Sequence, residues 1–262
     1  MIGFHGSPGS EVRPAECDHR FVRNESAYVA FRGRATQPLG ALYNAAPMNE
    51  RKGEKRGSAP PPRGALEPGT WLLALPASAI SGGPHADFAV GDRVTLAMEF
   101  VAEATILWER PVTHCEHVQH ARYLVSGKCA VAGDDFWVLD FGLRAYHAGP
   151  PPAGLKKGDP WTGRVALGVD TFLYAEDLHS RGSVPPLLYR FDVLELWRNA
   201  APFVEVPFPA VGRFKERDRE GLRHVAIERT DAENHDGGEA EYLVLLGLAE
   251  LLPTKPGFVG PG

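Results

Sequence analysis

The stretch Trp137-Val138-Leu139-Asp140-Phe141-Gly142-Leu143 has a loose copy later in the chain, Tyr242-Leu243-Val244-Leu245-Leu246-Gly247-Leu248. Both runs are apolar, and both end on Gly-Leu. Each run follows a Gly-Asp pair and a Leu-Trp pair, which are Gly91-Asp92 with Leu107-Trp108 and Gly158-Asp159 with Leu196-Trp197. The recurrence of a segment of this size predicts that one β-rich unit is used twice.

Short alternating runs make up most of the chain after residue 69. Apolar residues alternate with small or polar ones over 94–100 and again over 187–193, as expected for strands with one buried face. Two further runs, 123–131 and 136–146, flank a Gly-Asp turn at 133–134, which predicts a β-hairpin. Many short strands with Gly and Pro turns predict an all-β fold. We expect two small tandem β-barrel or sandwich units, of which OB-like barrels are one version, and few short helices.

The chain divides into five predicted parts. Residues 1–68 are predicted to be a mostly disordered N-terminal segment, because they have little apolar periodicity and contain Pro60-Pro61-Pro62. The other parts are a β-rich unit (69–149), a proline-rich linker (150–158), a second β-rich unit (159–252) and a loose C-terminal tail (253–262).

Finer expectations follow from the same patterns. Order is expected to begin with a strand at Thr70–Leu75, which Pro76 closes, and the stretch from about residue 109 to residue 122 is expected to be irregular. The last hairpin is expected to join 222–230 with 241–251.

Composition narrows the function classes. The 262 residues are 44% hydrophobic and 23% charged with a net charge of −5, so the average surface repels phosphate backbones and disfavours nucleic acid as a partner. No run reaches the roughly 18 to 20 apolar residues of a membrane span. The start has no secretory signal pattern, and three cysteines at irregular spacing do not form a disulfide framework. We therefore expect a soluble, cytoplasmic protein with no membrane contact.

The densest group of metal-ligating residue types is Thr113-His114-Cys115-Glu116-His117-Val118-Gln119-His120. On a helix, His114, His117 and His120 lie along one stripe and can hold zinc or nickel. On a strand, His117 points away from the other two, and the cluster cannot close on one ion. The alternatives are therefore a divalent transition-metal site and a polar loop without a ligand. No other cofactor is predicted.

A second candidate is a group of aromatic and acidic residues in the second unit: Phe172, Tyr174, Glu176, Asp177 and Tyr189. If the aromatic rings are exposed on one face, they can stack on a base, a sugar or a peptide. The alternative is that they belong to the core, which also takes aromatic side chains.

The sequence carries no phosphate-binding G-x-x-x-x-G-K-[ST] loop, no G-x-G-x-x-G turn and no G-x-S-x-G nucleophile motif. We therefore expect a non-enzymatic binding or interaction protein that recognises a protein or a small polar ligand, in an immunity-like or inhibitor-like role. The first alternative is a metal-assisted hydrolase or lyase that uses His114, His117 and His120. The second alternative is an OB-type single-strand nucleic-acid binder.

Overall fold

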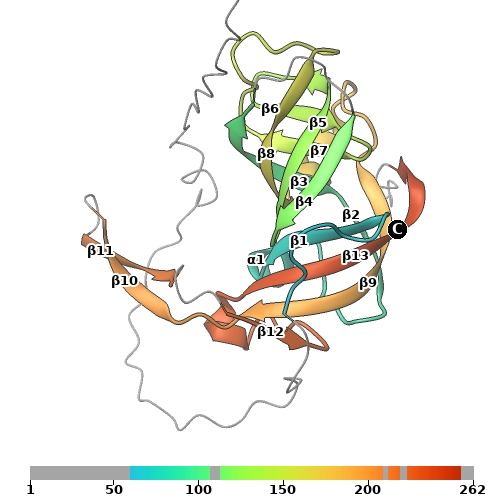
Figure 1. Cartoon of the computed structure of the whole chain (residues 1–262). Helices are drawn as coiled ribbons and strands as arrows, with labels where there is room; N and C mark the ends of the chain where they lie inside the picture. The colour runs from blue at the N-terminus through green and yellow to red at the C-terminus, as the bar shows by residue number, and fades with distance from the viewer. Residues whose placement is uncertain (1–59, 107–112, 209–211, 219–222, 255–262) are drawn as a thin grey trace, which may run out of the picture.

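The computed structural model describes residues 60–106, 113–208, 212–218 and 223–254, and strands dominate it (Figure 1). The strands are β1 (Thr70–Pro76), β2 (Arg93–Leu96), β3 (Met98–Thr105), β4 (His114–Gln119), β5 (Arg122–Ala132), β6 (Phe136–Asp140), β7 (Arg144–Ala148), β8 (Pro160–Val169), β9 (Leu188–Asn199), β10 (Phe203–Phe208), β11 (Gly212–Arg217), β12 (His224–Ile227) and β13 (Glu241–Thr254). The helices are α1 (Ser78–Ser81), α2 (Leu173–Glu176) and the 3₁₀ turns η3 (Leu178–Ser180) and η4 (His235–Gly238). The predicted all-β class with short helices is confirmed.

Five strands close a barrel. β3 pairs antiparallel with β8, β8 with β5, β5 with β6, and β6 with β7. β7 then returns parallel to β3 through the pair Glu99 and Tyr146. Closure leaves none of these five strands as a free edge within the barrel, which confirms the predicted β-barrel.

The remaining long strands continue the same sheet below the barrel in Figure 1. β1 joins β8 at Ala74 and Gly168, and its other edge pairs with β13. β13 pairs with β9, and β9 pairs with β2, which leads through Ala97 into barrel strand β3. Strands from both sides of residues 150–158 therefore share one sheet.

Several pairings differ from the expectations. The prediction that 222–230 and 241–251 form a hairpin is wrong, because β12 and β13 pair with opposite edges of β9. The stretch expected to be irregular contains β4, and the expected strand at 136–146 is divided into β6 and β7 by a turn. The strand predicted at Thr70–Leu75 is confirmed as β1.

The two glycines that the proposed repeat aligns, Gly142 and Gly247, lie in different kinds of backbone structure. Gly142 has a φ of +111° in the turn between β6 and β7, whereas Gly247 lies inside β13 opposite Thr70. Trp197 is fully buried in β9, and its proposed counterpart Trp108 lies outside the described residues. The predictions for residues 1–59 and 255–262 also fall outside them.

The main core runs from the barrel interior into the lower sheet. Inside the barrel, the Trp137 ring meets Phe100 at 4.7 Å and Trp161 at 5.2 Å between ring centroids, both edge to face. Such pairs contribute about 0.5–1.5 kcal/mol each beyond the area they bury. A second cluster lies outside the barrel, where Tyr174 and Leu178 of the α2–η3 segment cover Val138 and Tyr146.

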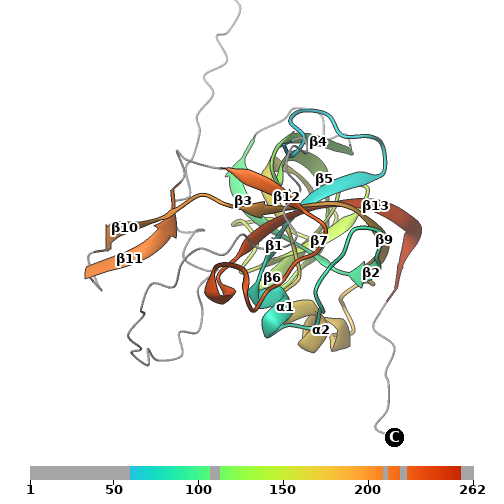
Figure 2. The ribbon, with the colours of Figure 1, turned by 90° about the horizontal axis from the view of Figure 1, so that it is seen from below.

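Two further features complete the fold. β10 and β11 form a separate two-stranded ribbon, called the arm, which projects from the body in Figure 1 and Figure 2. Within the described ranges, every helix is too short to cross a lipid bilayer.

A close backbone approach between β8 and β3 can be tested by substitution. A Cβ atom at Gly163 would overlap the carbonyl oxygen of Ala104 and the ring of Trp161, whereas a Cβ at Gly168 would only touch Ala74. We expect Gly163→Ala to lower the free energy of unfolding by about 3 kcal/mol, and Gly168→Ala by less than about 1 kcal/mol. Denaturant titration of both variants measures this, and equal losses would contradict the described barrel packing.

Candidate functional site

The histidine-rich stretch is a strand, so its side chains alternate between two faces. His114 and Glu116 are exposed and lie 3.4 Å apart on the solvent side. Cys115 packs against the main core, and burial raises the pKa of its thiol to about 12. A thiol with that pKa stays protonated at neutral pH and is a poor nucleophile and metal ligand.

His117 is buried and held by the backbone. Its Nδ1 lies 2.5 Å from the carbonyl oxygen of Gly64, and its Nε2 lies 2.6 Å from the carbonyl oxygen of His120. A metal ligand needs a ring nitrogen with a free lone pair. Both ring nitrogens of His117 instead face acceptor oxygens.

His120 lies in the turn between β4 and β5 with a φ of +49°. Its ring faces His224 of β12, with 5.1 Å between ring centroids. The structure thus separates His114 from this turn and brings in a histidine that the sequence reasoning missed, because no local pattern connects residues 120 and 224. Among the described residues, no group of three or more His, Cys, Asp or Glu side chains is arranged to hold a metal ion.

The surroundings favour neutral rings for His120 and His224. Burial lowers the pKa of His120, and the positive charges of Arg122 and Arg63 lower it further. Burial and the neighbouring His120 lower the pKa of His224 to about 4. At neutral pH, the two imidazoles therefore lie uncharged in a positively charged environment.

Both tyrosines of the predicted aromatic and acidic face are buried. Tyr174 and Tyr189 are 0% and 2% exposed, and their hydroxyl groups accept hydrogen bonds from the backbone N–H of Leu187 and Arg144. Phe172 is half-buried. These aromatic residues therefore do not present a shared stacking surface, and the core alternative describes both tyrosines.

The two acidic candidates lie on α2 and directly after it. Glu176 is exposed, whereas Asp177 binds the guanidinium of Arg181 at 2.5 Å. Arg181 also reaches Asp135 at 2.8 Å in the turn between β5 and β6. These ion pairs fasten the α2–η3 segment to the outside of the barrel.

A buried acidic pair lies beneath the same segment. Asp170 is 2% exposed and accepts hydrogen bonds from the backbone N–H groups of Tyr174 and Ala175 at the start of α2. The hydroxyl of Tyr146 donates to Asp170 and lies 3.3 Å from a carboxyl oxygen of Glu99. Burial and the charge of Asp170 raise the pKa of Glu99 to about 7. The Glu99 carboxyl therefore exists in both its protonated and its ionised form near neutral pH.

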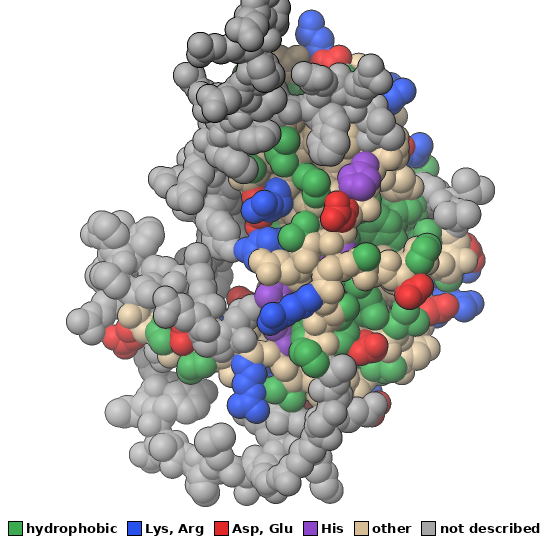
Figure 3. Space-filling view, viewed as in Figure 1, with side chains coloured by type: hydrophobic (Ala, Val, Ile, Leu, Met, Phe, Trp, Pro, Cys, Tyr) green, Lys and Arg blue, Asp and Glu red, His purple; other side chains and the backbone are tan. Residues whose placement is uncertain are grey.

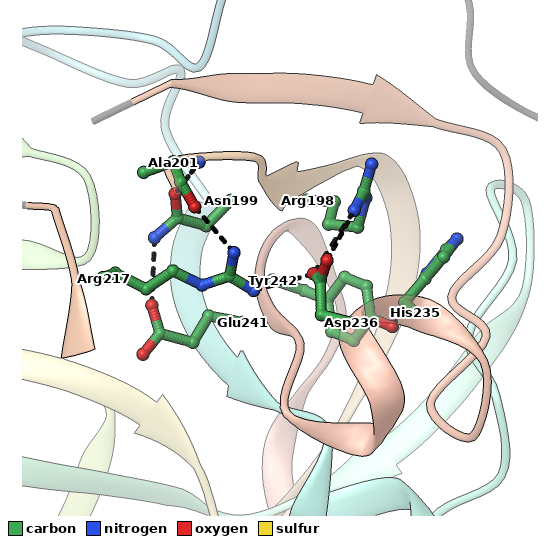
Figure 4. Close-up of polar contacts among 8 residues, drawn as sticks. All are labelled: Arg198, Asn199, Ala201, Arg217, His235, Asp236, Glu241 and Tyr242. Atoms are coloured by element: carbon green, nitrogen blue, oxygen red, sulfur yellow. Dashed lines mark hydrogen bonds and ion pairs between the residues drawn. The ribbon is translucent and has the colours of Figure 1, made fainter. Parts of the chain in front are cut away.

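The base of the arm is held by a polar network, shown in Figure 4. Asp236, whose φ is +53°, accepts from Arg198 at 3.0 Å and from Arg217 at 2.7 Å. Arg217, at the end of β11, also donates to the carbonyl oxygen of Ala201 at 2.7 Å and lies 4.0 Å from the ring centroid of Phe203.

The two guanidinium charges in this network keep the Asp236 carboxyl ionised. Burial opposes ionisation of Asp236, but the hydrogen bond from Arg217 and the two guanidinium charges lower its pKa. The first residue of β10 and the last of β11 are thereby fixed to η4, so the arm leaves the body in a set direction.

Comparisons of this chain with known protein families, with curated proteins and with solved structures find no match. The functional argument therefore depends on the geometry alone.

The acidic pair generates a pH prediction. The pKa of Glu99 rises from 4.5 to about 7 on folding, so the free energy of unfolding falls as pH rises through that interval. We expect Glu99→Gln to remove this part of the fall, measured by denaturant titrations from about pH 4 to about pH 8. The exposed Glu176→Gln is the control, and an unchanged slope in Glu99→Gln would contradict the assignment.

The arm base generates a stability prediction. Asp236→Asn keeps a residue that tolerates positive φ but removes the charge shared by Arg198 and Arg217. We expect it to lower the free energy of unfolding by about 3 kcal/mol, because two largely buried guanidinium groups lose a shared carboxylate. Asp192→Asn, which breaks an exposed pair with Arg93, is expected to cost far less, because solvent screens that pair. Thermal and denaturant unfolding measure the stability of both variants. If Asp236→Asn and Asp192→Asn lose the same free energy of unfolding, the role of burial is refuted.

Proposed function

We propose that this chain is a non-enzymatic binding protein that recognises another protein through its β10–β11 arm. The observation that supports this is the arm itself, which stands off the body and whose strands, within the described residues, pair only with each other. A lone two-stranded ribbon in water is marginally stable. A partner protein that covers the arm would bury its surface and so stabilise it.

The arm offers two means of contact. The two strands of the arm pair with each other along one edge each, and no other described strand pairs with either of them, so a further strand can be added at an outer edge. β10 also carries Val204, whose side chain is 37% exposed and gives the arm an apolar contact point.

Preorganisation strengthens the proposal. Arg217 and Asp236 fix the ends of both strands, and the carboxamide of Asn199 links Ala201 to Glu241. An arm that is already oriented loses less conformational entropy when a partner binds it. The partner therefore meets a ribbon whose base is already held in place.

The alternative of a metal-assisted hydrolase or lyase has weaker support, because His117 faces two carbonyl oxygens and His114 lies on the other face of β4. Single-strand nucleic-acid binding also has weaker support, because the net charge of −5 opposes phosphate backbones.

Val204 provides the sharpest test, because its side chain on β10 is 37% exposed. We expect wild-type protein to recover a stoichiometric protein partner from a lysate of its native organism, and Val204→Asp to reduce that recovery at least about tenfold, since a charge in a desolvated contact is costly. Mass spectrometry with quantitation measures both.

Val118→Asp is the matched control, because Val118 is 40% exposed on β4, away from the arm. Circular dichroism checks that both variants fold. Recovery of no stoichiometric partner at low salt, or equal losses in both variants, would reject the proposal. Analytical ultracentrifugation shows whether the partner is a second copy of the chain, in which case self-association is lost in Val204→Asp only.

A further inference from the structure

The paired rings of His120 and His224 have no hydrogen-bond partner among the described residues. Their centroids are 5.1 Å apart, and the Nδ1 atom of His120 is fully buried without an acceptor or donor. Buried polar atoms in folded proteins are nearly always satisfied, so an unsatisfied one calls for a missing ion, water or ligand. His120 also adopts a positive φ, a strained conformation that clusters at functional sites.

The charged groups around the pair come from several elements. Arg63 precedes β1, Arg122 begins β5, and both lower the pKa of His120 by their charge, as does His117 of β4. Glu103 of β3 holds Arg122 through a 2.7 Å contact. On the face in Figure 3, histidine side chains lie next to Lys and Arg side chains.

On the β12 side, the strand partner of His224 is the uncharged Asn199 of β9. Although Glu103 binds Arg122, the charges of Arg122 and Arg63 still lower the pKa of His120, so the surroundings of the pair favour an anion while the whole chain is negative.

We propose that His120 and His224, together with Arg63 and Arg122, bind a small phosphorylated ligand at the junction of the barrel and β12. Guanidinium groups and imidazole N–H groups are all donors, and the tetrahedral phosphate accepts hydrogen bonds from several directions. The arginines repel a metal cation from the same place. The two histidines come from the turn between β4 and β5 and from the start of β12, and the two arginines come from the segment before β1 and from the start of β5.

A bound anion changes the protonation of the two rings. Negative charge beside an imidazole favours its protonated form, so binding raises the pKa of His224 from about 4 and that of His120 as well. By linkage, affinity for an anion of fixed charge rises as pH falls from 7 towards 5. Sulfate, which stays a dianion over this range, is the probe for that measurement.

The main experiment follows the imidazole C2–H resonances by NMR during titration with inorganic phosphate at constant ionic strength. We expect the resonances of His120 and His224 to shift saturably with a dissociation constant below about 1 mM, and that of His179, whose Nδ1 lies 3.1 Å from the carbonyl oxygen of Tyr174, to stay constant. Glycerol 3-phosphate is titrated in parallel. Tighter binding of the ester identifies a phosphoester ligand, and equal binding identifies free phosphate.

Two variants separate binding from folding. His224→Gln is expected to weaken phosphate binding at least about tenfold, and so is Arg63→Ala, whose exposed side chain is not needed for the core. Arg93→Ala is the control, because it also removes an exposed guanidinium, and this one lies outside the cluster.

Three results would overturn the proposal. The first is no saturable shift at about 20 mM phosphate, or the same shift with sodium chloride. The second is tight Zn²⁺ binding that is lost in His224→Gln, which would assign a metal site. The third is single-stranded DNA binding that is tighter than phosphate binding and falls steeply with salt, which would assign a nucleic-acid surface.

Discussion

The whole arrangement depends on β8, which is hydrogen-bonded along both edges. One edge pairs with β3 over its length, and the other pairs first with β5 and then, at Gly168, with β1. This order closes the barrel and carries the sheet beyond it. It also requires close backbone approach, which is why a glycine stands at position 163, against Ala104. A strand buried between two neighbours cannot shift its register without exposing its apolar face.

The positions of two polar clusters, the His120–His224 pair and the Glu99–Tyr146–Asp170 group, follow from the pairing of β8. One edge of β8 changes partner from β5 to β1, and the first cluster lies at that junction. The turn between β4 and β5 occupies this junction, since the backbone N–H of Leu167 donates to the carbonyl oxygen of Ala121. His120 is therefore held beside the lower strands and meets β12. At the other junction, where β3 and β7 close the barrel, Glu99 and Tyr146 meet Asp170. Burial at both places changes the protonation of the groups involved.

Sequence patterns located many strands because alternation of burial is a local property. Phe100 and Phe191 are buried, as their positions in alternating runs predict. The same reasoning failed for β12, because two apolar strands with a polar loop between them need not pair with each other. Here β9 separates them. It also left open whether Tyr174 and Tyr189 are exposed, since an aromatic residue serves equally well in a core or on a surface.

Composition and residue spacing alone were enough for the strand content, the β-barrel class and the early position of β1, because each follows from backbone propensity and from near neighbours in the chain. Strand order, the burial of both tyrosines and the meeting of His120 with His224 depended on folding in three dimensions. Their physical cause is pairing between strands far apart in the chain, which desolvates particular side chains and joins particular charges. No local pattern encodes that pairing.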